Sequence, residues 1–270
     1  MGPEISPAKD KEARRPVINV TDGAVIPHKG RKGGLSSWRI SFFGAIVGLV
    51  LLPVLSPESY ISILKFVPDG LVVTFEVTVF GILLSLVIGL FVGLGQISRN
   101  PIISRIASVY VEIIRGIPLI VQIFYIYFAL GKLLHVEGVI AGILAMTVCY
   151  SAYLGEIFRA GIQSLPKGQL EASLALGLTR GQALRRVIIP QTISNVLPAI
   201  GNEFIALLKD SSLVSVVGIT DLMQRGRQYA SAHFAYFEAF TVVALVYLIL
   251  TLFLSRLVGL LEERMNKHGR

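Results

Sequence analysis

Long apolar runs alternate with short polar segments along most of this chain. Six runs approach the length at which a helix crosses the hydrocarbon core of a bilayer, which is about 20 residues. They cover residues 38–55, 70–97, 116–134, 138–158, 198–218 and 237–259. The pattern predicts an all-α polytopic membrane protein with six spans.

Two features within these runs predict how the helices pack and bend. Gly81, Ser85, Gly89 and Gly93 recur at one helical face of the second run, so they form a stripe of small side chains. Another helix can approach that stripe closely. Pro118 lies near the start of the third run and has no backbone N–H to donate, so we expect a kink or a helix start there.

Composition and charge narrow the class of protein. Of the 270 residues, 53% are hydrophobic and 16% are charged, and the mean hydropathy is +0.70, which excludes an ordinary soluble domain. The net charge is +8, and most lysines and arginines lie between or outside the apolar runs. Cytoplasmic loops of membrane proteins have this bias, so the sequence predicts that both termini are cytoplasmic.

The sequence contains no constellation typical of an enzyme. Cys149 is the only cysteine, the four histidines are scattered, and no segment resembles a phosphate-binding loop. We therefore expect no catalytic residues, no metal site and no cofactor, and we expect that the chain does not bind ATP itself.

The N-terminal part of the chain differs from the rest. Residues 1–37 are polar and rich in proline and basic residues, which predicts a disordered cytoplasmic tail. The run at 38–55 is apolar on all sides between Phe42 and Leu52, so it is expected to form an additional N-terminal transmembrane helix.

A polar segment at residues 161–197 separates two of the apolar runs and carries signals for two short helices. Gly177 fits the left-handed turn that ends a helix. Thr179 and Gln182 have the spacing of a capping box for the second helix, and Pro190 is expected to end or kink that helix. The segment therefore predicts a compact helix–turn–helix between membrane spans.

The order Glu171-Ala172-Ser173, then Gly177, then Val187-Ile188-Ile189-Pro190 resembles the EAA loop in permease subunits of bacterial ABC importers. Ser173, Val187 and Ile189 depart from that motif by residues of similar size or polarity. In the family, this loop is the coupling helix that sits in a cleft of the ATPase subunit. The alternative is a DNA-binding helix–turn–helix, which needs a soluble domain to carry it.

Three further segments make the resemblance more specific. Residues 110–122, 152–159 and 201–213 are similar to permeases for polar amino acids such as histidine, glutamine, glutamate, arginine and opines. The resemblance covers residues 66–265 and implies the MetI-like fold of type I ABC importers. Such permeases usually have five spans with the N-terminus outside, so the additional helix at 38–55 would move the N-terminus inside.

Two groups of residues are the functional candidates. The candidates for contact with an ATPase are Leu170, Glu171, Ala172, Leu174, Gly177, Arg185 and Arg186. The second group contains polar side chains within apolar runs, where a charge costs about 2.5–3.5 kcal/mol unless it faces a partner or water. These candidates for a substrate path are Gln122, Glu156, Asn202, Glu203, Lys209 and Asp210.

A zwitterionic amino acid needs both anionic and cationic partners, which this second group offers. Its carboxylates outnumber its cations, which favours neutral or cationic amino acids over acidic ones. The alternative for Lys209 and Asp210 is a buried ion pair that only holds the fold together.

The resemblance implies the permease subunit of an importer in the bacterial inner membrane. Such a subunit moves polar amino acids into the cytoplasm by alternating access. The implied partners are two copies of a cytoplasmic ATP-binding subunit, a second permease subunit and an extracytoplasmic solute-binding protein, with no nucleic acid.

Three other functions are compatible with parts of the sequence. One is a permease of the same fold for methionine or an osmolyte. Another is an ion-coupled secondary transporter that uses Lys209 and Asp210 as a relay, and a third is a membrane-anchored nucleic-acid-binding protein with a basic tail.

Overall fold

The computed structural model describes residues 36–268, which are helical apart from turns and short loops. The α-helices are α1 (Ser37–Leu55), α2 (Pro57–Phe66), α3 (Gly70–Gln96), α4 (Pro101–Gly116), α5 (Leu119–Phe124), α6 (Gly131–Leu134), α7 (Gly138–Gln163), α8 (Lys167–Ala175), α9 (Arg180–Ala183), α10 (Ile189–Asp210), α11 (Leu222–His233) and α12 (Tyr236–His268). Within this range, 3₁₀ turns occur at Val67–Asp69 and Ser211–Val217, and π-helical turns at Tyr125–Leu130 and Leu184–Ile188. The expected tail at residues 1–37 lies almost entirely outside the described residues.

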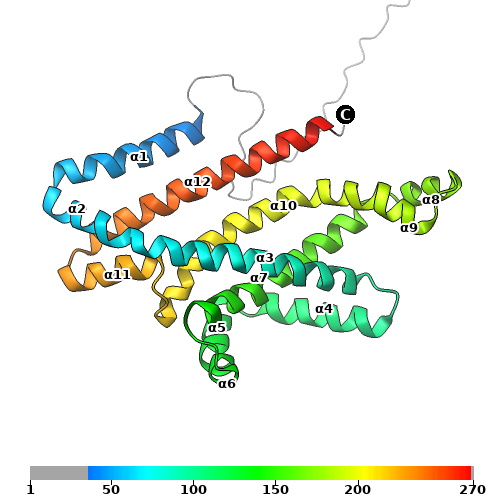
Figure 1. Ribbon diagram of the computed structural model, residues 1–270, viewed down its shortest axis with the longest axis horizontal. Helices are drawn as coiled ribbons and strands as arrows, with labels where there is room; N and C mark the ends of the chain where they lie inside the picture. Colours follow the sequence, from blue (N-terminus) through cyan, green and yellow to red (C-terminus); the bar gives the residue numbers. More distant parts are fainter. Residues whose placement is uncertain (1–35, 269–270) are drawn as a thin grey trace, which may run out of the picture.

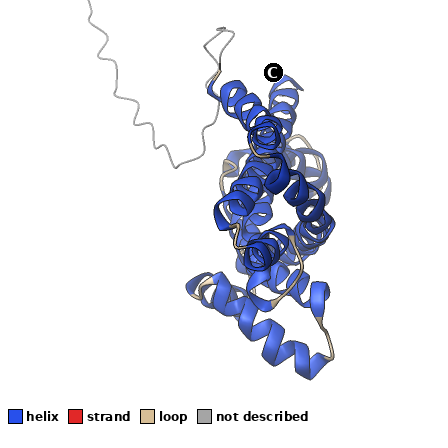
Figure 2. Cartoon of the chain, turned by 90° about the vertical axis from the view of Figure 1, so that its left-hand side faces the viewer, coloured by secondary structure: helices blue, strands red, loops and turns tan. Residues whose placement is uncertain are grey.

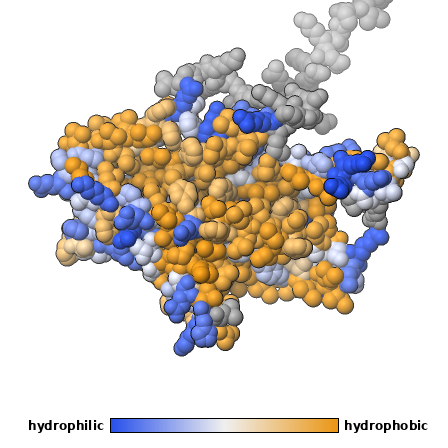
Figure 3. Space-filling model, viewed as in Figure 1, coloured by the Kyte–Doolittle hydropathy of each residue, from blue (hydrophilic) through white to orange (hydrophobic). Residues whose placement is uncertain are grey.

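The long helices form one bundle (Figure 1). In this bundle α7 packs against α3 and α10, α12 packs against α10, and α4 lies beside α3 and α7. Figure 2 shows the same bundle turned by 90°, with only helices and loops in the described part of the chain. Hydrophobic side chains cover most of the face seen in Figure 3, and hydrophilic ones gather toward the ends of the bundle.

Four helical stretches are long and apolar enough to cross a membrane: Ser37–Leu55, Pro57–Gln96, Gly138–Gln163 and Tyr236–Arg264. A fifth possible span is α4 together with the helices from Leu119 to Leu133, which are bent against α4 by 104°. Helix α10 is not among these stretches and carries three charged residues in its second half. The all-α membrane fold is confirmed, and the count of six spans stays a prediction.

The small-residue stripe on α3 packs against α7, as the sequence predicts. A Cβ atom on Gly89 would lie 2.8 Å from Leu154 Cβ, and one on Gly93 would lie 2.6 Å from the Gly155 carbonyl oxygen. One turn before Gly89, the buried Ser85 hydroxyl donates to the Thr147 carbonyl at 3.2 Å. Larger side chains would push these two helices apart.

The expected helix at 38–55 is α1, which lies along α12. Trp38 Nε1 donates to the Leu252 carbonyl at 2.9 Å, and a Cβ on Gly48 would lie 3.6 Å from Leu245. The later residue of α1 therefore meets the earlier residue of α12, which makes the pair antiparallel. The opposite face of α1 is apolar and exposed.

Two sequence-based expectations about local structure need correction. Pro190 does not end the second short helix, because helical residues continue from Arg180 through the π-helical turn into α10. Pro190 lies in the first turn of α10, where a missing N–H is tolerated. The helix that contains most of the predicted fifth span at 198–218 therefore starts earlier, at Ile189, and the residues after Asp210 form a 3₁₀ turn.

Tyr60 of α2 is buried at 6% exposure in a core cluster with Ile63 and Leu222. The kink expected at Pro118 is confirmed by the bend between α4 and α5. Pro118 precedes α5 in an extended conformation, which breaks the helical path.

Candidate functional site

The loop between α7 and α10 extends beyond the rest of the bundle, where α8 and α9 form a small helical unit (Figure 1). Helix α8 ends in a Schellman motif around Gly177, which has φ of +82°. The Leu178 N–H donates to the Ser173 carbonyl at 3.2 Å, and the Gly177 N–H donates to the Leu174 carbonyl at 3.0 Å. The left-handed turn predicted at Gly177 is therefore confirmed.

A capping box starts the second helix of this unit, also as the spacing predicts. The Gln182 N–H donates to Thr179 Oγ1 at 3.3 Å, and the Thr179 N–H donates to Gln182 Oε1 at 3.0 Å. Each side chain satisfies a backbone donor that the helix start leaves free. The Schellman motif and the capping box together fix the turn between α8 and α9.

Most candidates for contact with an ATPase lie on the surface of this unit. Glu171, Ala172, Leu174, Gly177, Arg185 and Arg186 are exposed, and Leu170 is half-buried. Leu176 is 84% exposed and is not among the candidates named from the sequence. Its position directly before the predicted glycine turn was the sequence signal that could have identified Leu176.

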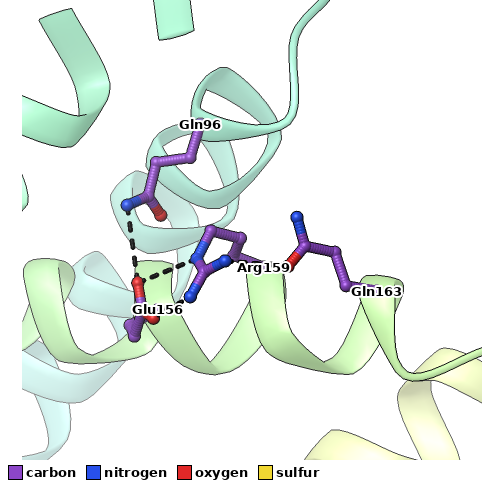
Figure 4. A network of polar contacts seen from close by, with 4 residues as sticks. All are labelled: Gln96, Glu156, Arg159 and Gln163. Carbon is purple, nitrogen blue, oxygen red and sulfur yellow. Dashed lines mark hydrogen bonds and ion pairs between the residues drawn. The ribbon is translucent and has the colours of Figure 1, made fainter. Parts of the chain in front are cut away.

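Four polar side chains meet where α7 approaches the end of α3, and Figure 4 shows them. Arg159 pairs with Glu156 through two nitrogens. Nε donates to Glu156 Oε2 at 3.0 Å, and Nη2 donates to Glu156 Oε1. Arg159 Nη1 also donates to Gln163 Oε1 at 2.7 Å, and Gln96 Nε2 donates to Glu156 Oε2 at 3.4 Å. The network joins the last residue of α3 to the last residue of α7.

A polar cavity of about 350 Å³ opens beside this network. Its lining brings Glu112 and Arg115 of α4 to the same space as Glu156 and Arg159 of α7. Glu112 and Arg115 do not pair with each other in the described part of the chain. The Arg115 guanidinium instead lies 5.2 Å from the centre of the Tyr153 ring. The cavity wall therefore offers two carboxylates and two guanidinium groups.

Within residues 36–268, the polar residues of α10 make no hydrogen bond to that network. The Tyr150 hydroxyl donates to Asp210 Oδ2 at 2.8 Å, Glu203 is half-buried, and Asn202 and Lys209 are exposed. Adjacent residues of a helix point about 100° apart, so the Lys209 side chain points in a different direction from the Asp210 side chain. No ion pair joins Lys209 to Asp210 in the described residues. The alternative of a buried structural pair is therefore wrong.

Gln122 is buried at the bend between α4 and α5. Its Nε2 donates to the carbonyls of Ile114 at 2.7 Å and Ile117 at 2.8 Å. The break at Pro118 leaves such carbonyls without helical partners, and the Gln122 amide satisfies them. The structure thus places the path candidates in three regions: the bend, the cavity and α10.

The chain is similar to proteins of one known family. The family model described as binding-protein-dependent transport system inner membrane component matches residues 81–267. The glutamine transport system permease protein of Escherichia coli (strain K12) is 38% identical over 201 residues, which cover 73% of this chain and 92% of that protein.

Two solved structures share the fold. One is the crystal structure of an amino acid ABC transporter with histidines, with a TM-score of 0.71 and 40% identity, covering 77% of this chain and 97% of that one. The other is an inward-facing structure of the MetNI methionine ABC transporter, with a TM-score of 0.60 and 26% identity, covering 78% and 98%. Both confirm the MetI-like arrangement.

Proposed function

This chain belongs to the family of binding-protein-dependent transport system inner membrane components, and from that premise we propose that it imports polar amino acids. It is a multi-pass inner-membrane permease subunit of an ABC importer and not an enzyme. The glutamine permease and the amino acid transporter crystallised with histidines support a polar amino acid as substrate.

The projecting α8–α9 unit is the observation that supports coupling of transport to a separate ATPase. Its exposed acidic, apolar and basic side chains form a surface that the rest of the described chain does not cover. The unit lies directly after α7, so a movement of the ATPase against it would act on a long helix of the bundle. Two ATP-binding subunits, a second permease subunit and an extracytoplasmic solute-binding protein complete the proposed complex.

Alternating access is the proposed mechanism of transport. A charged side chain within the membrane faces water or a partner rather than lipid, because contact of a charge with lipid is costly. Glu156 lines the polar cavity, and Glu203, Asn202 and Lys209 lie at accessible positions on α10. These residues line the proposed path, with acidic groups meeting the α-amino group and cationic or amide groups meeting the carboxylate.

The proposed orientation places the α8–α9 unit and both termini in the cytoplasm. The antiparallel α1–α12 pair supports this arrangement, because the N-terminal end of α1 lies near the C-terminal half of α12. The domain division proposed from the sequence keeps residues 38–55 as an additional helix in front of the transport domain at 66–265.

The test is purification of the permease with its ATPase, followed by transport of glutamine and arginine into proteoliposomes in the presence of the solute-binding protein. We expect ATP-dependent uptake, and we expect Glu156→Gln, Glu203→Gln and Asp210→Asn to change the rate or the amino-acid preference. Uptake driven by an ion gradient without an ATPase would contradict the coupling proposal. Parental rates and preference in all three assembled variants would contradict the path.

A further inference from the structure

Arg159 occupies a connecting position between the polar cavity and the base of the α8–α9 unit. Two of its nitrogens hold the Glu156 carboxylate, whose other contact is Gln96 at the end of α3. A third nitrogen holds the Gln163 amide oxygen at 2.7 Å. Gln163 is the last residue of α7, and α8 begins at Lys167. A single guanidinium therefore contacts both the cavity wall and the start of the projecting loop.

The backbone around this guanidinium is tightly packed on two sides. A Cβ on Gly93 of α3 would lie 3.2 Å from the Arg159 backbone nitrogen, and one on Gly161 of α7 would lie 2.0 Å from Val196 Cγ1 of α10. Helix α7 is therefore held between α3 and α10 close to the loop. Displacement of the loop acts on the side-chain contacts of Arg159 more readily than on this packed backbone.

The ion pair itself is suited to exchange. The side chains of Arg159 and Glu156 are 32% and 30% exposed, so water reaches both groups. Arg115 lines the same cavity, its guanidinium lies over the Tyr153 ring, and its charge already acts on Glu156, so a second cation is available to this carboxylate. The carboxylate can change partners without being left buried and unpaired, which would be the costly outcome.

We propose that Arg159 is a positioning residue that transmits movement of the α8–α9 unit to the cavity. When the loop moves, Gln163 draws the guanidinium away, and Glu156 turns toward the cavity and Arg115. When the loop returns, Arg159 holds Glu156 again. This inference rests on the proposed function, because it assumes that the loop is the ATPase-coupling element.

The experiment measures ATP hydrolysis by the complete complex in proteoliposomes, with and without the solute-binding protein loaded with glutamine or arginine. Arg159→Gln and Gln163→Leu each remove one link of the chain. We expect both to lower the ratio of stimulated to basal hydrolysis at least about fivefold, the lower end of typical coupling effects, while the KM for ATP stays unchanged. Gln163→Glu keeps an oxygen acceptor for Arg159 and is expected to restore the ratio.

Arg105→Gln is the matched control, because it removes an exposed arginine of α4 that lines a separate apolar groove. It should leave the ratio at the parental value. A parental ratio in both Arg159→Gln and Gln163→Leu would overturn the proposal, and so would a fall in Gln163→Leu that Gln163→Glu does not reverse.

Coupling in Gly177→Val, compared with coupling in the Arg159 and Gln163 variants, separates this proposal from the proposed function. If Gly177→Val loses coupling while the Arg159 and Gln163 variants keep it, the loop couples and only the Arg159 inference fails. If Gly177→Val keeps coupling, the loop is not the coupling element and the proposed function fails as well.

Discussion

Tyr150 and Asp210 are 60 positions apart, and the Tyr150 hydroxyl donates to Asp210 Oδ2 at 2.8 Å. The bond connects the middle of α7 to the end of α10, where the helix passes into a 3₁₀ turn. It therefore positions a carboxylate that the sequence indicated only as one member of a charged pair. The same bond gives a direct test of how α7 and α10 hold together.

Tyr150→Phe should lower the stability of the permease by about 1.5–3 kcal/mol, the usual contribution of a hydrogen bond to a charged group. The phenyl ring keeps the packing of the tyrosine ring. The loss of stability therefore arises because the Asp210 carboxylate no longer has its hydrogen-bond donor. Thermal unfolding of the purified permease in detergent measures the effect. Tyr125→Phe is the control, since Tyr125 is 65% exposed. Equal unfolding temperatures for the two variants would contradict this assignment.

Gly177→Val should abolish coupled transport by distorting the turn between α8 and α9. The backbone has φ of +82° there, and a β-branched residue resists that conformation at a cost of about 1–2 kcal/mol. A Cβ would meet no neighbouring atom within 4 Å, so only the backbone is strained. ATPase co-purification and amino-acid uptake measure the result.

Gly177→Asn should retain most activity, because asparagine tolerates a left-handed conformation better than valine does. Gly168→Val is the matched control in the same unit, at a glycine that has open space and is not in the left-handed region. Normal assembly and parental uptake in Gly177→Val would refute the importance of this turn.

The sequence predicted those features that depend on local signals. Gly177 and the Thr179–Gln182 capping box each require particular residue types at fixed spacing, and both form as expected. The glycine stripe of α3 is similarly periodic. The position of Pro190 was misjudged, because a proline fits both the end of one helix and the first turn of the next.

The polar contacts depend on tertiary structure and were harder to predict. Gln96 and Gln163 are neutral residues at helix ends, and nothing in their sequence context indicates that both reach the Glu156–Arg159 pair. Glu112 and Arg115 reach the cavity because α4 packs beside α3 and α7. The sequence indicated a kink at Pro118 but not its size of 104°. Such relationships need the packed bundle.

Gly93→Ala should destabilise the contact between α3 and α7. The added methyl group would lie 2.6 Å from the Gly155 carbonyl oxygen, which is too close for a carbon atom. Overpacking of this kind costs about 1–3 kcal/mol. A lowered unfolding temperature in detergent measures it, and Gly44→Ala is the control because its Cβ would meet nothing within 4 Å. If the Gly93 variant is as stable as the control, α3 and α7 can move apart at little cost, and the expected overpacking is contradicted.

The topology prediction places residue Ala24 in the cytoplasm and the segment after Lys132 outside. The bias of basic residues motivates it, and α1 supplies the additional crossing. Reporter fusions that are active on only one side of the membrane measure each location. A fusion at Ala24 that reports the outside would mean that α1 does not cross in the expected direction.

Asp221 predicts a pH dependence of stability in the segment between α10 and α11. Its side chain is fully buried, accepts the Gln224 N–H at 2.8 Å as the N-cap of α11, and accepts the Tyr247 hydroxyl at 3.4 Å. Burial raises the pKa of Asp221 from its ordinary 3.8 to about 6. The folded state therefore binds the proton more tightly than the unfolded state does.

Protonated Asp221 therefore stabilises the folded state. This stabilisation is complete below about pH 3.8 and is lost as the pH rises through about 6. At pH 5 the protonated carboxyl should contribute about 1.4 kcal/mol. Asp221→Asn keeps a neutral acceptor and should reduce the change in unfolding temperature between pH 5 and pH 7.5. Asp69→Asn is the control, because the Asp69 side chain is 66% exposed. If Asp221→Asn retains the whole parental pH dependence, the dependence arises from other groups, and the Asp221 carboxyl is ionised throughout this range.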